Sequence, residues 1–234
     1  MAVVLENRCV GPEVYRMRLA QTPSTPGQFY MLRPLEGAGD PLLGRPISVF
    51  DCVEGDSVFL YKVVGRGTQL LSRKREGDEV AAIGPLGNGF PLEDANLTLI
   101  GGGIGIAPLY YLLKEHGRLF PARKRRVYLG YSGESFLTED FAALADACKV
   151  NIGGFVTEDV DFGLGGLYCA CGPTPMLRAA KREAERCNAR LLLSLEARMA
   201  CGVGACLGCS CETLLGNKRV CKDGPVFPAE EVLL

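Results

Sequence analysis

The sequence has almost no net charge, because its 26 lysines and arginines are balanced by 27 aspartates and glutamates. This balance gives no electrostatic footprint for nucleic acid or for an anionic membrane surface, so we expect neither as a partner. The one basic cluster, "RKRR" at residues 123–126, precedes an apolar run and favours a solvated loop over a phosphate-binding patch.

Long apolar runs are also missing. No window approaches the roughly 18 consecutive apolar residues that a membrane-spanning helix needs. The N-terminal "MAVVLENRCV" lacks the basic and long apolar regions of a signal peptide. We therefore expect a cytoplasmic protein. Internal repeats and low-complexity tracts are absent as well.

Tryptophan is absent and histidine occurs once, whereas cysteine occurs 11 times. An odd number of cysteines in a cytoplasmic chain argues against a disulfide framework. Cys9, Cys52, Cys148 and Cys187 are scattered and are interpreted as small buried hydrophobic residues. The cysteines near the C-terminus need another explanation.

Residues 1–93 are expected to form a small antiparallel β-barrel. Short β-forming runs are separated by proline and glycine, a pattern typical of such barrels. The runs lie at residues 29–34, 46–53, 57–64 and 78–84, with one short helix at 68–74.

Residues 94–190 follow a different pattern, in which strands alternate with helices. This alternation predicts a parallel sheet with right-handed crossovers, and hence an α/β domain. We expect Thr138 to cap the second helix and basic residues to lie on one face of the third. The predicted strands are residues 96–100, 126–132, 150–156 and 166–172, and the predicted helices are 109–117, 138–147 and 174–188.

Residues 191–234 begin within a strand-like run, "ARLLLSLEARM" at residues 189–199, that leads into the cysteines. So short a segment cannot build a large core and usually needs a metal or a cluster for stability. We therefore expect a third, small C-terminal domain.

Three of its cysteines have the spacing C-x4-C-x2-C, and a fourth follows after a longer gap. This spacing is typical of a plant-type 2Fe–2S cluster. Soft thiolate ligands match iron, and a glycine-rich loop can wrap closely around the cluster and aim N–H groups at its sulfur. The predicted ligands are Cys201, Cys206, Cys209 and Cys221, and the glycines are Gly202, Gly204 and Gly208.

Two other interpretations of this segment remain open. A structural zinc site usually has two C-x2-C pairs, and only one occurs here. A set of buried free thiols conflicts with so many glycines. Cys211 is left over by the spacing, and we expect it to point away from the iron, although it could substitute as a ligand.

Two glycine turns in the α/β segment could hold a nucleotide. "GGGIGIAP" lies between a strand and a helix, where backbone N–H groups favour a pyrophosphate, but a plain tight turn would look the same. "CGPTPM" follows a later strand and could place Cys171 against a nicotinamide ring, or could simply start a helix.

Two motifs in the barrel segment could hold phosphate or flavin. In "RPIS", Arg45 offers a bidentate fork for a phosphate and Ser48 a hydroxyl for a ring nitrogen. In "GRGT", Gly67 and Thr68 open a helix whose N-terminus suits a phosphate. Either motif alone could be an ordinary turn.

Together, "RPIS", "GRGT", "GGGIGIAP" and "CGPTPM" resemble the ferredoxin-NADP reductase superfamily in their order and spacing. That family joins an FAD-binding barrel to an NAD(P)-binding α/β domain. The segment "CGVGACLGCSCE" with the later "VCKDGPVF" is similar to the electron-transfer subunits of type B dihydroorotate dehydrogenases. This resemblance covers essentially the whole chain.

The resemblance implies a role for each matching residue. Lys62 stands where the family often has arginine, so its phosphate contact should have weaker geometry. No catalytic side chain is assigned. FAD is expected at Arg45, Pro46, Ile47, Ser48, Leu60, Tyr61, Lys62, Gly67 and Thr68; the dinucleotide is expected at Gly101, Gly102, Gly103, Gly105, Cys171, Gly172 and Pro173.

The resemblance also implies electron transfer between NAD(H), FAD and a 2Fe–2S cluster. The partner would be an FMN-containing dihydroorotate dehydrogenase catalytic subunit of pyrimidine biosynthesis, in a heterotetramer with two copies of each. Alternatives are the reductase subunit of a hydrogenase or of an NADH-dependent ferredoxin:NADP oxidoreductase, or a zinc- or iron-stapled redox sensor or assembly protein without catalysis. We expect the loop at residues 130–135 to contact the ribose, with Glu134 disfavouring a 2′-phosphate.

Overall fold

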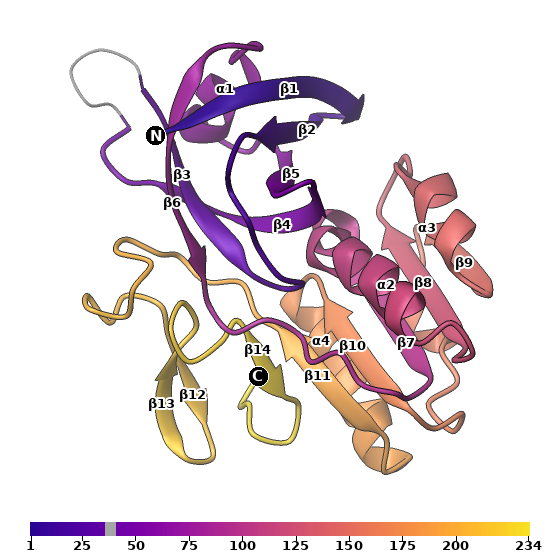
Figure 1. Cartoon of the computed structure of the whole chain (residues 1–234). Coiled ribbons are helices and arrows are strands. Elements are labelled where there is room, and N and C mark those ends of the chain that lie inside the picture. Colours follow the sequence, from indigo (N-terminus) through magenta and orange to yellow (C-terminus); the bar gives the residue numbers. More distant parts are fainter. Residues whose placement is uncertain (36–40) are drawn as a thin grey trace.

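A computed structural model describes residues 1–35 and 41–234. The first part of the chain is a closed antiparallel barrel with the strand order β1-β2-β5-β4-β3-β6 (Figure 1). A short helix, α1, follows β5. The elements are β1 (Ala2–Gly11), β2 (Val14–Leu19), β3 (Phe29–Pro34), β4 (Arg45–Val53), β5 (Asp56–Lys62), α1 (Arg66–Ser72) and β6 (Glu79–Leu86).

The four barrel strands and the helix that the sequence predicted are confirmed as β3 to β6 and α1. The first two strands were missed. Their burial follows no clean alternation, and the register shifts between Val4 and Glu6 and again between Cys9 and Gly11. Such irregularities interrupt the period-2 pattern on which strand prediction depends.

The second part of the chain forms a sheet with the order β14-β11-β10-β7-β8-β9. Strands β7 to β11 pair in parallel, and β14 adds an antiparallel edge. The elements are β7 (Leu97–Gly102), η2 (Gly103–Ile106), α2 (Ala107–Leu119), β8 (Arg125–Tyr131), α3 (Thr138–Leu144), β9 (Ala147–Ile152), η3 (Val156–Asp159), β10 (Leu167–Cys171), α4 (Thr174–Arg186), β11 (Arg190–Ser194) and β14 (Val226–Pro228).

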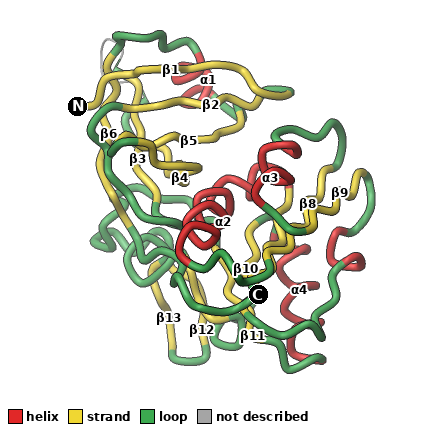
Figure 2. The backbone as a smooth tube through the Cα atoms, turned by 45° about the vertical axis from the view of Figure 1, so that its right-hand side comes forward, coloured by secondary structure: helices red, strands yellow, loops and turns green. Residues whose placement is uncertain are grey.

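Helices cover both faces of this sheet. Leucines of α2 and Phe141 of α3 pack on one face, whereas Leu177, Ala180 and Ala184 of α4 pack on the other. Figure 2 shows this division. The α/β domain with a parallel sheet that the sequence predicted is therefore confirmed, and its helices lie on both faces.

Two local predictions in this segment are wrong. Cys187 was expected to be buried and is exposed, as is Cys9 of the barrel. Thr138 does not cap α3, because it is the first residue of the helix and the N-cap position belongs to Leu137, which has φ of +56° and no capping side-chain hydrogen bond. A left-handed residue at this position turns the chain into the helix without a hydroxyl cap.

The C-terminal segment carries the cysteines in a loop, followed by the two-stranded hairpin of β12 (Ser210–Thr213) and β13 (Gly216–Arg219). Hydrogen bonds attach this segment to the barrel, because Asn88 Nδ2 donates to the carbonyls of Lys222 and Asp223 at 3.3 and 3.2 Å. Strands β11 and β14 lie within residues 190–234 yet complete the α/β sheet. The domain boundaries 1–93, 94–190 and 191–234 therefore stay a proposal, with the last segment sharing its strands with the sheet.

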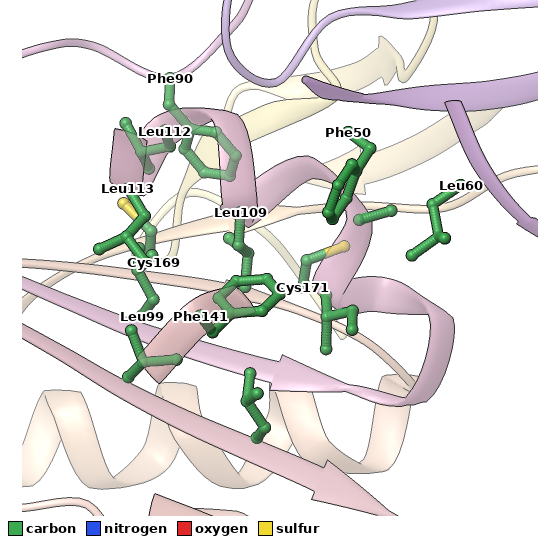
Figure 3. Close-up of a cluster of buried hydrophobic side chains, with 14 of the residues drawn as sticks. Phe50, Leu60, Phe90, Leu99, Leu109, Leu112, Leu113, Phe141, Cys169 and Cys171 are labelled. Carbon is green, nitrogen blue, oxygen red and sulfur yellow. The ribbon is translucent and has the colours of Figure 1, made fainter. Parts of the chain in front are cut away.

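Apolar side chains join the barrel to the α/β segment in one continuous core. Phe50 and Leu60 of the barrel belong to the same buried cluster as Leu109, Phe141 and Cys171 (Figure 3). Burial of this size fixes the two parts against each other. No helix among the described residues is long and apolar enough to cross a membrane.

Candidate functional site

A large cavity of about 1140 Å³ lies beside the carboxyl ends of the sheet strands. Gly102 ends β7 and Gly103 follows it, Tyr131 ends β8, Gly153 follows β9, and Pro173 lies just after β10. Ligands of open α/β sheets bind at this edge, next to the point where the strand order reverses. That point lies here between β7 and β10. The cavity is large enough for a dinucleotide.

Only some of the predicted dinucleotide residues line the large cavity. Gly102, Gly103 and Pro173 line the large cavity, whereas Gly101, Gly105 and Gly172 line neither this cavity nor the second one described below. Gly103 has φ of +54°, and a Cβ atom on it would meet no other atom within 4 Å, so its role is the turn itself.

Three arginines of α4 were missed as site residues. Arg178, Arg182 and Arg186 recur at every fourth position and line the large cavity. Their guanidinium groups can attract the phosphates of a dinucleotide. The signal was present in the sequence, because basic residues were expected on one face of this helix.

The loop expected to contact the ribose is only partly at the cavity. Ser132 lines it, whereas Glu134 is exposed and is not among the lining residues. The expectation that Glu134 disfavours a 2′-phosphate therefore has no support from its position.

A second, smaller cavity of about 350 Å³ brings the barrel motifs together. It is mostly apolar with a few polar groups, which suits a cofactor ring. Of the predicted flavin residues, those that line it are Arg45, Pro46, Ile47, Ser48, Leu60, Tyr61, Lys62 and Thr68.

Gly67 does not line this cavity, but it makes room for Arg45. A Cβ atom on Gly67 would lie 2.1 Å from Arg45 Nε, so only glycine permits the guanidinium to lie here. Arg45 Nη1 also donates to the carbonyl of Leu43. The Arg45 fork is thus held against α1, where it can meet a phosphate.

Two side chains differ from their expected roles in detail. The Tyr61 hydroxyl donates to Asn7 Oδ1 at 3.0 Å, so this polar group is already paired within the protein. The Thr68 hydroxyl closes the start of α1, accepting from the Val64 N–H at 3.0 Å and donating to the Gly65 carbonyl at 3.0 Å. Thr68 therefore shapes the turn next to the cavity.

Cys171 lines the smaller cavity rather than the larger one. It is 2% exposed and pairs in register with Ser194 of β11, which lines the same cavity. Burial raises the pKa of the Cys171 thiol above its ordinary value. The group is therefore a neutral thiol at the wall between the two cavities.

The wall formed by the C-terminal segment was also missed. Glu196, which follows β11, lines the smaller cavity; it is exposed to solvent, and desolvation at the cavity wall raises the pKa of its carboxyl. The only sequence signal was the position of "LSLEARM" at the carboxyl end of a predicted strand. The lining residues of this segment are Ser194, Leu195, Glu196, Ala197, Met199 and Pro225.

The four predicted cluster cysteines lie in two contacting pairs. The Cys206 N–H approaches Cys201 Sγ at 3.4 Å, and the Cys221 N–H approaches Cys209 Sγ at 3.5 Å. Backbone N–H groups, first that of Cys206, lower the pKa of Cys201 to about 6. Burial and the neighbouring Cys209 raise the pKa of Cys221 to about 12.

Four thiols are the ligand set that a 2Fe–2S cluster uses. Among the described residues, no three cysteine, histidine or carboxylate side chains gather tightly enough for one metal ion. Two pairs of thiols with backbone N–H groups directed at sulfur match the chemistry of a 2Fe–2S centre. Such donors would hold the cluster as thiolates.

Exposure differs between the pairs. Cys206 is exposed and Cys201 is half-buried, whereas Cys209 and Cys221 are each 2% exposed. Cys211 lies on β12, packs against the same hydrophobic core as Cys209, and has a pKa raised by burial. That Cys211 is not a ligand stays a prediction.

These sites define a class of protein, namely a reductase that joins a flavin barrel to a dinucleotide-binding sheet. A solved structure of an NADH-dependent reduced ferredoxin–NADP oxidoreductase superposes with a TM-score of 0.87 at 28% identity, covering 100% of this chain and 90% of that chain. A cytochrome P450 reductase of Amycolatopsis gives 0.64 at 28% identity, covering 79% and 65%.

Residues 196–233 match the model of the iron–sulfur cluster binding domain of dihydroorotate dehydrogenase B. An electron transfer subunit of dihydroorotate dehydrogenase B (NAD(+)) from Caldanaerobacter subterraneus subsp. tengcongensis is 42% identical over 99% of this chain and 97% of its own length. One from Clostridium acetobutylicum is 35% identical over 99% and 96%. The chain belongs to the family of dihydroorotate dehydrogenase B electron transfer subunits, as its motifs predicted.

Proposed function

We propose that this chain transfers electrons between NAD(H) and a dihydroorotate dehydrogenase catalytic subunit through FAD and a 2Fe–2S cluster. The observation that carries this proposal is the position of the smaller cavity. Its walls include Cys171, which precedes the turn at the dinucleotide cavity, and Met199 and Pro225, which flank the cysteine loop. A flavin in this cavity would therefore lie between the electron donor and the electron acceptor.

The cofactors supply the reactivity: a flavin takes a hydride from NADH, leaving NAD+, and can release the two electrons singly to an iron–sulfur cluster. The protein positions these groups and excludes water. For the dinucleotide, the turn at Gly102 and Gly103 and the arginines of α4 would bind the phosphates.

At the flavin, Arg45 would pair with a phosphate, and Lys62 would add a second positive charge at the exposed end of β5. Ser48 would offer its hydroxyl to the ring. Cys171 would pack against the ring as a neutral thiol, because burial raises its pKa. The cavity is therefore apolar where the ring would lie and basic where the phosphates would lie.

At the cluster, Cys201, Cys206, Cys209 and Cys221 would be the ligands. The exposed side of this loop is apolar, since Val203 and Leu207 are 52% and 61% exposed on either side of Cys206. Exposed apolar side chains around an electron-transfer centre suit a protein interface. We place the catalytic subunit here.

The finer features of the assembly belong to the same proposal. The partner would carry FMN and oxidise dihydroorotate to orotate in pyrimidine biosynthesis, in a heterotetramer with two copies of each subunit. The near-zero net charge supports neither nucleic acid nor an anionic membrane as a further partner. A cytoplasmic location suits 11 cysteines that form no disulfide.

One alternative function has a specific observation in its favour. The structural match to the ferredoxin–NADP oxidoreductase extends over the whole chain, but at 28% identity it is more distant than the 42% identical dihydroorotate dehydrogenase subunit. The dihydroorotate assignment is therefore preferred. A non-catalytic zinc- or iron-stapled sensor does not agree with the family to which the chain belongs.

The direct test is an anaerobic titration of the purified chain with NADH, followed by absorbance and electron paramagnetic resonance. We expect flavin and cluster bands to bleach, and the partner subunit to restore NAD+-dependent orotate formation. A protein without flavin or iron, or one that NADH does not reduce, would contradict the proposal.

Two cysteine variants test the assignment of the ligands. Cys209→Ser should lose the cluster and its signal, because it removes a ligand, whereas Cys211→Ser should keep both. Iron content measured with flavin content distinguishes the two, since each variant should retain FAD. If Cys211→Ser loses iron and Cys209→Ser does not, the ligand set is wrong.

A further inference from the structure

The strand that carries the flavin motif continues into a contact with the nucleotide-binding segment. Ser48 of β4 lines the smaller cavity, and two and three residues later Phe50 and Asp51 contact α2. The register of β4 against β5 shifts between Val49 and Asp51, so a β-bulge lies at Phe50. Bulges re-aim side chains, often beside functional sites.

The bulge lets both residues face out of the barrel. Val49 belongs to the barrel core, whereas Phe50 belongs to the core shared with α2 (Figure 3). Regular alternation would return Asp51 to the barrel interior. Instead, its carboxylate meets Lys114 of α2.

The first part of this contact is a stack of two rings. The rings of Phe50 and Tyr110 are parallel within 10°, with centroids 4.3 Å apart. Tyr110 in turn meets Phe141 of α3 edge to face at 5.3 Å. Phe50 is 2% exposed, so the stack is part of the packed core and leaves little freedom to slide.

The second part is a half-buried ion pair. Lys114 Nζ donates to Asp51 Oδ1 at 2.7 Å and to Oδ2 at 3.0 Å. Asp51 Oδ1 also accepts the Cys52 N–H at 2.8 Å, which fixes the carboxylate on its own strand. The Asp51 side chain is 8% exposed and that of Lys114 is 35% exposed, so the carboxylate is shielded from solvent whereas the ammonium group is screened in part.

Helix α2 connects this contact to both cavities. Tyr110 and Lys114 are four residues apart and so lie on one face of the helix. At its start, Ala107 and Pro108 line the smaller cavity. The turn just before it carries Gly102 and Gly103, which line the larger one. Moving α2 relative to β4 would therefore move the two cavities relative to each other.

We propose that Asp51 and Lys114, with the stacked rings of Phe50 and Tyr110, are positioning residues that hold the dinucleotide cavity and the flavin cavity in register for hydride transfer. This inference rests on the proposed function. None of the four side chains needs to touch a cofactor. Their effect is on the distance between donor and acceptor, to which rates are steeply sensitive.

The test uses the double variant Asp51→Asn/Lys114→Met in the holoprotein with its flavin and cluster. Replacing both partners removes the ion pair without leaving a buried, unpaired charge. Anaerobic stopped-flow reduction by saturating NADH should slow about 10- to 100-fold, because a small misplacement costs this much. FAD content and the dissociation constant of NADH should stay within about twofold of the wild type, since each cavity keeps its own walls.

Two further variants serve as controls for the double variant. Lys114→Arg keeps the charge and should restore most of the rate. Lys124→Met breaks another Lys–Asp pair, the one between Lys124 and Asp146 at 3.2 Å. This pair lies at the end of the sheet opposite to the carboxyl ends of the strands, so its loss should leave the rate unchanged. Should the double variant fail to fold, Tyr110→Leu removes the ring stack but keeps an apolar side chain, and the same slowing is expected.

Hydrogen–deuterium exchange gives a readout independent of activity. Amides of residues 49–53 and 107–115 should exchange faster in the double variant than in Lys124→Met. A wild-type reduction rate combined with faster exchange would overturn the proposal, as would a slower rate with unchanged exchange. If NADH does not reduce even the wild type, the proposed function fails, whereas exchange still tests the contact.

Discussion

The two cavities of this chain differ in the origin of their walls. The larger cavity is lined entirely by residues between Gly102 and Cys187, within the α/β segment. The smaller cavity takes its walls from the barrel, from the start of α2 and from the C-terminal segment, between Phe29 and Pro225. The larger one needs only the sheet and its helices, whereas the smaller one needs the whole tertiary assembly.

This comparison explains why the sequence motifs of the two cavities behave differently. The glycine turn of the larger cavity is local, and its role depends on one strand and one helix. The proposed flavin motif depends on Gly67, which leaves space for Arg45 of another strand. Variants that act on one cavity should therefore leave the other intact.

The largest effect is expected from Gly67→Ala. The added Cβ would lie 2.1 Å from Arg45 Nε and displace the guanidinium from the smaller cavity. Losing one charge-assisted hydrogen bond to a phosphate should weaken FAD binding about 10- to 100-fold, as measured by flavin fluorescence. NADH binding should not change. Gly65→Ala is the matched control, since a Cβ there meets no atom within 4 Å; equal losses in both would refute the role of the close approach.

A second effect should appear in the larger cavity alone. Gly103→Ala places a side chain at φ of +54°, which strains the turn by about 1–2 kcal/mol. We expect the dissociation constant of NADH to rise about tenfold, measured by calorimetry, with FAD content unchanged. Gly55→Ala places a side chain at φ of +86° between β4 and β5, away from both cavities, and should leave NADH binding unchanged. Loss of FAD from Gly103→Ala would contradict the independence of the cavities.

A third, smaller effect concerns the attachment of the C-terminal segment. Asn88→Ala removes the hydrogen bonds from Nδ2 to the carbonyls of Lys222 and Asp223. The free energy of unfolding should fall by about 1–2 kcal/mol in denaturant melts. FAD binding should weaken severalfold, because Pro225 lines the smaller cavity. Asn96→Ala removes a comparable bond to the Lys124 N–H and should cost stability without affecting FAD.

The smallest effect is a pH dependence of the apo chain. Desolvation at the wall of the smaller cavity raises the pKa of Glu196, although the residue is exposed to solvent, so ionisation costs the folded state slightly more than the unfolded state. This cost is absent below the ordinary pKa of 4.5 and complete above the raised value. The melting temperature of Glu196→Gln minus that of the wild type should therefore increase as the pH rises from acid to neutral. A flat difference would show that the carboxyl is not desolvated in the cavity.

Much of the fold could be predicted because its signals are local. Strands β3 to β6 and the alternating elements after residue 94 follow apolar runs with proline and glycine between them. Strands β1 and β2 escaped prediction because their bulges interrupt the alternation. The Thr138 cap was wrong because Leu137 adopts a left-handed conformation that its residue type does not favour.

The sequence by itself determined the chemistry of this protein, because its signals lie in short stretches of chain. These signals are the flavin motif, the glycine motif and the spacing of Cys201, Cys206, Cys209 and Cys221. Only the tertiary structure decided that Cys171 and Glu196 line the flavin cavity, and that β4 and α2 join the two cavities through Asp51 and Lys114. The physical reason is distance along the chain. Contacts between residues far apart in the sequence depend on how whole elements pack, and no local pattern encodes them.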